Sequence, residues 1–253
     1  MSGGNYTKEH SQLDRKDRSS TELRPISYQL DFQMHPAGSV MIRWGQTRVL
    51  CSVTTLNRVP KWILEQKLEG GWLTAEYRMM PGATADRSPR ESGGGGPGGR
   101  SQEIQRLIGR SLRAVVDLEK IGQRTVCVDC DVIDADGGTR CAAITGSSVA
   151  LSLAFERMFQ EGALSAWPMK DHVAAVSAGV VDGEMLLDLC YEEDAGADVD
   201  INIVMTSSNR YVEVQGTAEG EPFSQEQLDE MTSAAREAIP SIFEGQSQAL
   251  RNR

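Results

Sequence analysis

The segment DADGGTR, residues 134–140, places two adjacent glycines before a threonine and an arginine. We expect it to join a strand to a helix, where the first backbone N–H groups lack intrahelical partners. Gly137 and Gly138 allow a ligand to approach the backbone closely. Thr139 adds a hydroxyl group, and Arg140 adds a guanidinium that can form two parallel hydrogen bonds. These groups suit a phosphate ion, although a glycine-rich turn with an N-cap threonine explains the same residues equally well.

A second predicted helix start has similar residues. Gly98, Gly99 and Arg100 precede Ser101, which is a suitable N-cap for the helix that follows. Two cationic helix starts are more than a solvated surface requires. If the fold brings them together, we expect them to hold one small oxyanion from two sides.

Acidic residues gather in the segment YEEDAGADVD, residues 191–200. Asp198 and Asp200 share a face if this part is a strand, and Asp194 is expected in the loop before them. Carboxylates at this density bind a hard cation such as Mg²⁺ or supply a general acid, whereas a solvated acidic loop is the more common interpretation. Because Asp200 begins the apolar run DINIVMT, at the mouth of a buried strand, we favour a functional role.

Other chemistries find less support in the sequence. No GxSxG motif accompanies any of the three histidines, so a Ser-His hydrolase is not expected. Cys127 and Cys130 form a CxxC, but the alternating pattern around them places them on opposite faces of a strand, where they cannot grip one metal ion. The five cysteines, an odd number without an export signal, do not indicate a disulfide framework.

The elements that must position these residues follow from hydrophobic periodicity and turn signals. Hairpins are expected around residues 182–183 and 208–209, and a loop or hairpin over residues 61–71. The expected strands include residues 40–44, 48–54, 71–80 and 125–134. The expected helices cover residues 101–122, closed by Gly122, residues 139–159, and residues 224–245, capped by Ser224. This order of elements predicts an α+β protein.

Composition sets the class and the compartment that we expect. Hydrophobic residues make up 40% and charged residues 25%, as in globular proteins. No apolar run approaches the roughly 20 residues of a membrane helix, and the N-terminus lacks an apolar signal core, so we expect a cytoplasmic protein with no membrane partner. We predict a disordered tail over residues 1–16, a single domain over 17–243 and a frayed end over 244–253. Residues 81–100 are expected to form a mobile loop inside that domain.

The charge distribution indicates where an anion would bind. A net charge of −10 argues against a general nucleic-acid coat protein, because phosphate contacts need clustered cations. Arginines nevertheless concentrate in the middle of the chain, so we expect this part to meet an anionic ligand. They are Arg87, Arg90, Arg100, Arg106, Arg110, Arg113 and Arg124.

Several longer motifs, in order from about residue 14 to 243, closely resemble the bacterial ribonuclease PH family of tRNA nucleotidyltransferases. They include ELRPI, GQTRVLCSVT, GWLTAEYRMMPGAT, GRSQEIQRLIGRSLRAVVDLEKIGQRTVCVDCDVIDADGGTR and LLDLCYEEDAGADVDINIVMT. The resemblance implies the ribonuclease PH fold, in which duplicated βαβ-type halves have mixed sheets packed on helices. It also implies a homohexamer built as a trimer of dimers.

The resemblance further implies a phosphorolytic 3′→5′ exoribonuclease. In such an enzyme inorganic phosphate attacks the last phosphodiester, and residues beyond the CCA end of tRNA precursors leave as nucleoside diphosphates in a reversible reaction. The family's catalytic acids match Asp194 and Asp200, with Mg²⁺ as the usual cofactor. Its phosphate-binding residues match Arg100, Gly138, Thr139 and Arg140. We expect Arg87, Arg90, Arg106 and Arg110 to bind RNA.

Two segments depart from the family pattern. Residues 61–71 are acidic and apolar where a Lys- and Gly-rich segment is expected, and Gly82 stands where arginine is usual. Both lie where the family contacts tRNA or a neighbouring subunit, so they bear on RNA affinity and ring assembly.

Two other functions compete with phosphorolysis. A catalytically silent ring subunit that binds RNA or scaffolds partners usually loses the phosphate loop or the acids, and this chain keeps both. A Mg²⁺-dependent hydrolase would shorten RNA without added phosphate, so an assay with and without phosphate separates it.

Overall fold

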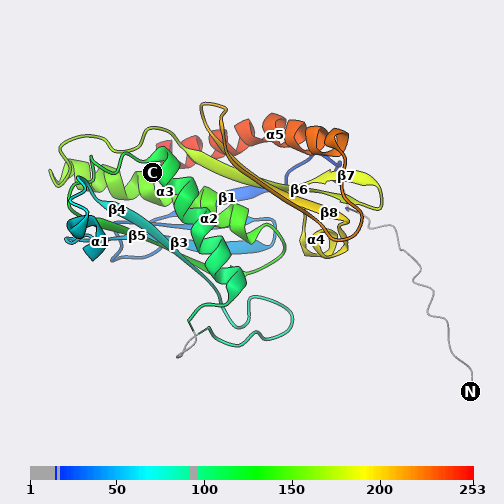
Figure 1. Cartoon of the computed structure of the whole chain (residues 1–253), viewed down its shortest axis with the longest axis horizontal. Coiled ribbons are helices and arrows are strands. Elements are labelled where there is room, and N and C mark those ends of the chain that lie inside the picture. The colour runs from blue at the N-terminus through cyan, green and yellow to red at the C-terminus, as the bar shows by residue number, and fades with distance from the viewer. Residues whose placement is uncertain (1–14, 16–17, 92–95) are drawn as a thin grey trace, which may run out of the picture.

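The computed structural model describes residue 15 and residues 18–91 and 96–253 (Figure 1). The tail predicted to be disordered falls almost entirely outside these residues, as do residues 92–95 at the centre of the predicted mobile loop. Within the described part of the chain, no helix is long and apolar enough to cross a membrane.

Five strands form the first sheet, in the order β1-β2-β3-β5-β4. β4 and β5 run parallel and are connected through helix α2 (Gly99–Val115), whereas the other neighbours are antiparallel. Every second residue of β5 is buried, from Val126 to Val132, which is the alternation that the sequence predicts. The strands are β1 (Ile26–Leu30), β2 (Gly38–Trp44), β3 (Thr47–Leu56), β4 (Trp72–Met79) and β5 (Thr125–Asp134).

The CxxC cysteines lie on opposite faces of β5, as predicted. Cys130 is buried, with its sulfur 3.2 Å from the hydroxyl oxygen of Ser147. Cys127 is half-buried on the other face. The motif therefore belongs to the strand and does not form one site.

Four antiparallel strands form the second sheet, in the order β7-β6-β8-β9. They are β6 (Val173–Val181), β7 (Glu184–Leu187), β8 (Val199–Thr206) and β9 (Tyr211–Ala218). Both predicted hairpins are confirmed, with the turn residues Asp182, Gly183 and Asn209 at positive φ. The α+β class is also confirmed. The second sheet is not mixed, however, because all of its strand pairs are antiparallel. Among the described residues, the parallel βαβ crossover occurs only in the first half, because β8 pairs with β6 directly as an antiparallel neighbour.

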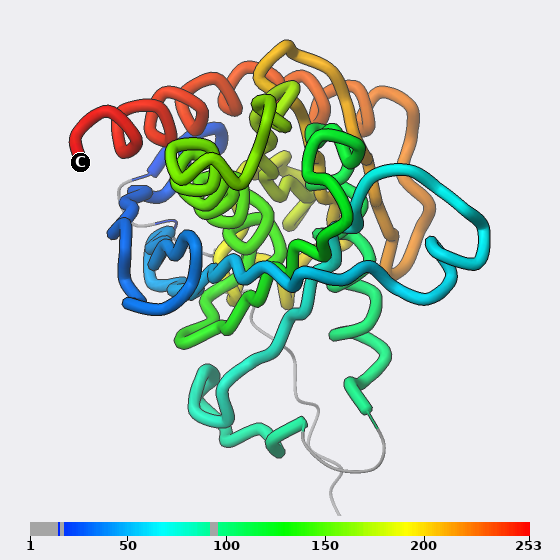
Figure 2. Tube along the Cα trace, turned by 90° about the vertical axis from the view of Figure 1, so that its left-hand side faces the viewer, coloured from blue at the N-terminus to red at the C-terminus, as the bar shows by residue number. Residues whose placement is uncertain are grey.

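Helix α3 (Thr139–Gln160) packs between the two sheets, and α5 (Gln225–Arg251) crosses the second sheet and β1 on the outside (Figures 1 and 2). Small residues along α3 allow this close packing. A Cβ at Gly146 would lie 2.8 Å from the sulfur of Cys51 and from Cγ2 of Ile42. Hydrophobic residues of both sheets meet around α3 in one buried cluster.

Three local predictions in the first half are wrong. Residues 61–71 begin with a short helix, α1 (Lys61–Glu65), where we expected a loop or hairpin. Helix α2 has Gly98 as its N-cap, and Ser101 lies inside the helix with its hydroxyl donating to Glu91. It ends at Val115 and not at Gly122, because Val116 adopts an extended conformation and forms a β-bridge with Met169.

The predicted fraying of residues 244–253 is also wrong. Helix α5, capped by Ser224 as predicted, continues to Arg251. Gln246 is buried and donates to the backbone oxygens of Thr145 and Val173, while Leu250 packs against the core. These contacts hold the last turns in place.

Candidate active site

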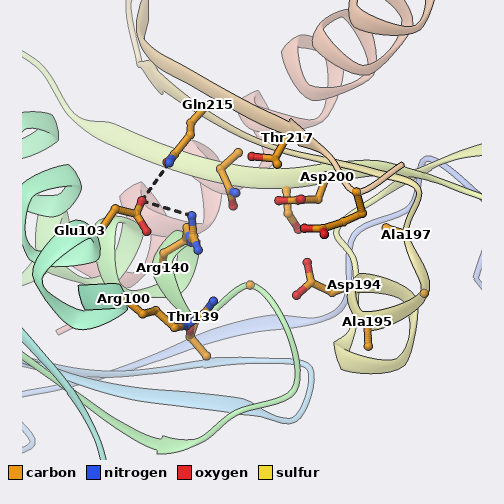
Figure 3. A pocket seen from close by; sticks show the side chains of 15 residues that line it. Arg100, Glu103, Thr139, Arg140, Asp194, Ala195, Ala197, Asp200, Gln215 and Thr217 are labelled. Atoms are coloured by element: carbon orange, nitrogen blue, oxygen red, sulfur yellow. Dashed lines mark hydrogen bonds and ion pairs between the residues drawn. The ribbon is translucent and has the colours of Figure 1, made fainter. Parts of the chain in front are cut away.

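A polar pocket of about 670 Å³ lies where the starts of α2 and α3 face the second sheet and the short helix α4 (Tyr191–Gly196) (Figure 3). The fold brings together the six residues that the sequence marks as phosphate-binding or catalytic. They are Arg100, Gly138, Thr139, Arg140, Asp194 and Asp200. Their separation along the chain is large, so the convergence depends on both sheets.

The two glycines before α3 both adopt left-handed conformations, with φ of 68° at Gly137 and 64° at Gly138. A Cβ at Gly137 would lie 2.4 Å from the backbone oxygen of Leu189, so only glycine fits there. Gly138 is the N-cap of α3. The hydroxyl of Thr139 is 2.7 Å from that of Tyr77, so the alternative of an N-cap threonine is wrong. No side chain of the described residues caps this helix, so its first backbone N–H groups can donate to a ligand in the pocket.

A buried ion pair between Arg24 and Asp188 contacts the loop that contains Gly137 and Gly138. Arg24 Nη2 lies 2.6 Å from Asp188 Oδ1, and the backbone N–H of Arg24 donates to Oδ2 at 2.7 Å. Trp44 Nε1 donates to the same oxygen at 2.9 Å. The guanidinium also donates to the backbone oxygen of Asp136, next to the two glycines. Burial lowers the pKa of Arg24, but the charge and hydrogen bonds of Asp188 outweigh it and raise the pKa overall.

Arg100 and Arg140 supply the positive side of the pocket (Figure 3). The Arg140 side chain is largely buried, and its Nη1 lies 3.6 Å from Glu103 Oε1. That oxygen also accepts from Gln215 Nε2 at 2.9 Å, which fixes the carboxylate between α2 and β9. Burial raises the pKa of Tyr77, and both arginines partly offset the rise, so both guanidinium groups act on its hydroxyl.

Asp194 and Asp200 supply the negative side and point into the same space (Figure 3). Asp194 lies in helix α4 and not in a loop, because the Cys190 N-cap and Glu193 form a capping box. Burial raises the pKa of Asp200, and the negative charge of Asp194 raises it further. Asp198 is exposed and does not line the pocket, although we expected it to share a face with Asp200.

Two carboxylates that point into the same space fit a hard divalent cation. Among the described residues, no three or more histidine, cysteine, aspartate or glutamate side chains form a metal-binding group. Mg²⁺ is commonly bound through one or two carboxylates together with substrate phosphates and water. The pair therefore fits Mg²⁺ better than it fits a metal that needs a full protein cage.

The four arginines expected to bind RNA lie outside this pocket. Arg87 and Arg90 belong to the segment between β4 and α2. Arg106 and Arg110 lie farther along α2, in a separate groove with Arg113. Sequence patterns also missed Glu103, Gln215 and Tyr77. A weak signal existed for Glu103, since it follows Arg100 by three residues on one helix.

Comparisons with known proteins agree with this arrangement. The "3′ exoribonuclease family, domain 1" matches residues 22–155, and "domain 2" of that family matches residues 171–238. Ribonuclease PH of Halalkalibacterium halodurans is 51% identical over 236 residues, which is 92% of this chain and 91% of that protein. A chain of the Archaeoglobus fulgidus exosome, solved with RNA bound to the active site, has a TM-score of 0.76 at 23% identity, covering 90% of each chain. Rice (Oryza sativa) Rrp46 has a TM-score of 0.74 at 20% identity, covering 93% of this chain and 99% of that one.

Proposed function

This chain belongs to the 3′ exoribonuclease family that includes ribonuclease PH, and from that membership we propose that it trims tRNA precursors by phosphorolysis. Inorganic phosphate is the co-substrate, and nucleoside diphosphates are the products. Because the reaction is reversible, the enzyme is also a tRNA nucleotidyltransferase. A silent scaffold is less well supported, because the pocket keeps both the arginines and the acids.

One observation carries the proposal: two arginines and a helix start face two aspartates across one pocket. Phosphoryl transfer depends mainly on positioning and on charge neutralisation. The arginines and the helix N–H groups can hold a phosphate ion, which leaves the acidic side for the end of the RNA. The two reactants, both negatively charged, are then brought together by fixed positive groups.

The roles of individual residues follow from this division. Arg100, Arg140 and the helix start at Gly138 and Thr139 would orient the phosphate so that one of its oxygens attacks the terminal phosphorus. The bond from phosphorus to the 3′ oxygen breaks, and that oxygen takes up a proton. Asp200, whose pKa is raised, is suited to deliver the proton from its carboxyl group.

Alternatively, Asp194 and Asp200, both ionised, would hold Mg²⁺ together with phosphate oxygens of the substrate. When bound, the ion supplies charge neutralisation at the reacting phosphates. This assignment is supported by the exposure of Asp194 to the pocket and by the pKa of Asp200, which burial and then the negative charge of Asp194 raise.

The proposal extends to RNA binding and assembly. We assign Arg87 and Arg90 to contacts with the RNA near its 3′ end, and we assign the chain to a homohexameric ring of three dimers. Support for the ring comes from the fold shared with exosome-core chains. The proposal places the enzyme in the cytoplasm, where tRNA precursors mature.

The test uses a tRNA with a few extra 3′ residues, incubated with and without phosphate. We expect shortening to the mature end and nucleoside diphosphates only when phosphate is present, and Arg140→Ala should abolish both. Shortening without phosphate would indicate a hydrolase. RNA binding without shortening in either condition would indicate a silent subunit.

A further inference from the structure

Asn202 of β8 lines the active-site pocket, but it is not among the six residues assigned to phosphate or to catalysis. Its side chain is buried, with 8% of the residue exposed. Oδ1 accepts from the thiol of Cys141 at 3.4 Å, whereas Nδ2 donates to no protein atom in the described part of the chain. Buried amides normally have their hydrogen bonds satisfied, so free donors at the wall of a pocket indicate a ligand.

The Cys141 thiol determines which side of the Asn202 amide faces the pocket. Burial raises the pKa of Cys141 to about 12, so the sulfur remains protonated and acts as the donor. Cys141 is buried and does not line the pocket, so Oδ1 of Asn202 is directed toward the protein interior. Nδ2 is therefore left on the side of the pocket.

The same contact places Asn202 beside the start of α3. Cys141 is the third residue of this helix, and the first intrahelical bond runs from the N–H of Ala142 to the backbone oxygen of Gly138. The three N–H groups before Ala142 therefore have no intrahelical acceptor. Arg140, which precedes Cys141, lines the pocket at the same point. Asn202 thus adds a donor next to the positive side of the pocket.

The strand register places Asn202 one step from the acidic side. Asn202 follows Asp200 by two residues on β8, so the two side chains share a face, about 7 Å apart along the strand. Asn202 pairs with Gln215 of β9, which lies on the side of Arg140 in Figure 3. Asp200 lies on the side of Asp194 in the same view. Asn202 therefore stands between the groups assigned to phosphate and those assigned to the leaving oxygen.

We propose that Asn202 is a catalytic residue whose Nδ2 donates a hydrogen bond to a non-bridging oxygen of the transferred phosphoryl group. The inference rests on the proposed function, because it assigns a donor for the same reaction. An oxygen of inorganic phosphate bonds to phosphorus, the bond from phosphorus to the 3′ oxygen breaks, and that oxygen takes up a proton. During this step negative charge is spread over the non-bridging oxygens, which lie between the attacking and the leaving oxygen. A fixed donor between the two sides of the pocket stabilises that charge. Cys141 acts through Asn202 and is a positioning residue.

RNA that carries one sulfur in place of a non-bridging oxygen of its last linkage tests the contact. Sulfur is the weaker acceptor, so we expect the unaltered protein to cleave one of the two diastereomers about tenfold more slowly than all-oxygen RNA. Asn202→Ala should lower kcat on all-oxygen RNA about 100-fold, the usual loss for one such donor. The KM for phosphate should change less than about twofold, because the interaction is made in the transition state.

The sulfur effect separates a contact with substrate from a structural role. In Asn202→Ala the same sulfur should slow the reaction less than about twofold, because the donor is already absent. Asn252→Ala, at the exposed end of the chain, is the control and should keep the kcat and the sulfur effect of the unaltered protein. If Asn202→Ala lowers the urea midpoint, Asn202→Leu provides the same comparison, since it keeps the side-chain volume and removes the donors.

Two variants of Cys141 test how the amide is held. Cys141→Ala removes the donor to Oδ1 and should lower kcat about threefold to tenfold, as expected for one hydrogen bond. Cys141→Ser keeps a hydroxyl donor and should retain most of the activity. Equal losses in the two variants would contradict the positioning role of the thiol.

The outcomes distinguish this role from the proposed function. A sulfur effect that persists in Asn202→Ala, or that is absent for both diastereomers in the unaltered protein, would overturn the contact. A higher KM for phosphate with unchanged kcat would overturn it as well. If the unaltered protein releases no nucleoside diphosphate in the presence of phosphate, the proposed function is wrong, and the role of Asn202 is rejected with it.

Discussion

Arg24 and Asp188 form a buried ion pair that joins the segment before β1 to the loop before α4, next to Gly138 of the pocket. Asp188 is 1% exposed and has a positive φ of 56°. A Cβ at Gly138 would lie 3.0 Å from Arg24 Nη2, so the guanidinium supports the glycine. The pair therefore links the positive side of the pocket to the segment that carries Asp194.

Breaking this pair should be costly. Arg24→Ala leaves the Asp188 carboxylate buried with fewer donors, and we expect a loss of about 3–5 kcal/mol in the free energy of unfolding. The control is Arg48→Ala, which breaks the half-exposed pair with Asp134 and should cost about 1 kcal/mol or less. Urea unfolding measures both. Similar losses in the two variants would contradict the structural role of the buried pair.

Gly137→Ala should impair phosphate use more than stability alone explains. The added Cβ would meet the backbone oxygen of Leu189, so the loop must move away. A displacement of about 1 Å at a reacting group lowers rates about 100-fold, and we expect that loss in kcat/KM for phosphate. Gly162→Ala is the control, because it has a similar φ of 72° and no neighbour within 4 Å of the new Cβ. Equal activity of the two variants would show that the loop geometry is not needed.

Glu103→Gln should tighten phosphate binding. The carboxylate competes with phosphate for Arg140, at 3.6 Å, and its side chain is 43% exposed. Removing the charge should lower the KM for phosphate about twofold to fivefold, as expected for a partly exposed ion pair. Steady-state kinetics at varied phosphate measure the change, with Glu244→Gln on α5 as a control outside the pocket. A higher KM in Glu103→Gln would mean that the carboxylate orients Arg140 more than it competes.

Asp129 should make stability depend on pH. Burial and then the charges of Glu76 and Asp131 raise its pKa. A carboxyl with a raised folded pKa contributes stability below its unfolded pKa, at about pH 4, and loses it as pH rises through the folded value. Asp129→Asn should therefore stabilise the protein at about pH 8 and have less effect at about pH 4. Urea unfolding at both pH values tests this, and a larger gain at the lower pH would contradict it.

Local patterns predicted most elements and pointed to six of the residues that line the pocket, but they missed others such as Glu103 and Gln215. Strand β5 and both hairpins follow from the alternation of apolar and polar residues and from the turn residues. The helix start at Gly138 follows from the two adjacent glycines. That Asp194 and Asp200 meet Arg100 and Arg140 follows from the family resemblance, because local periodicity carries no information on distant segments.

The missed features depend on contacts between distant parts of the chain. Arg24 and Asp188 are 164 residues apart, and although both stand in motifs of the family resemblance, no local spacing marks them as partners. Helix α2 ends at Val115 because Val116 forms a β-bridge with Met169. The last turns of α5 are ordered by the hydrogen bonds of Gln246. Residues that complete the pocket from β9, such as Gln215, face α2 only after both sheets have packed on α3.

The central claim is that free phosphate is the attacking reagent, and isotope-labelled phosphate tests it most directly. A tRNA with extra 3′ residues is incubated with the enzyme and labelled inorganic phosphate, and the released nucleotides are separated. We predict one label per released nucleotide, in the β-phosphate of a nucleoside diphosphate, and none with Arg140→Ala. Release of unlabelled nucleoside monophosphates at the same rate without phosphate would contradict phosphorolysis.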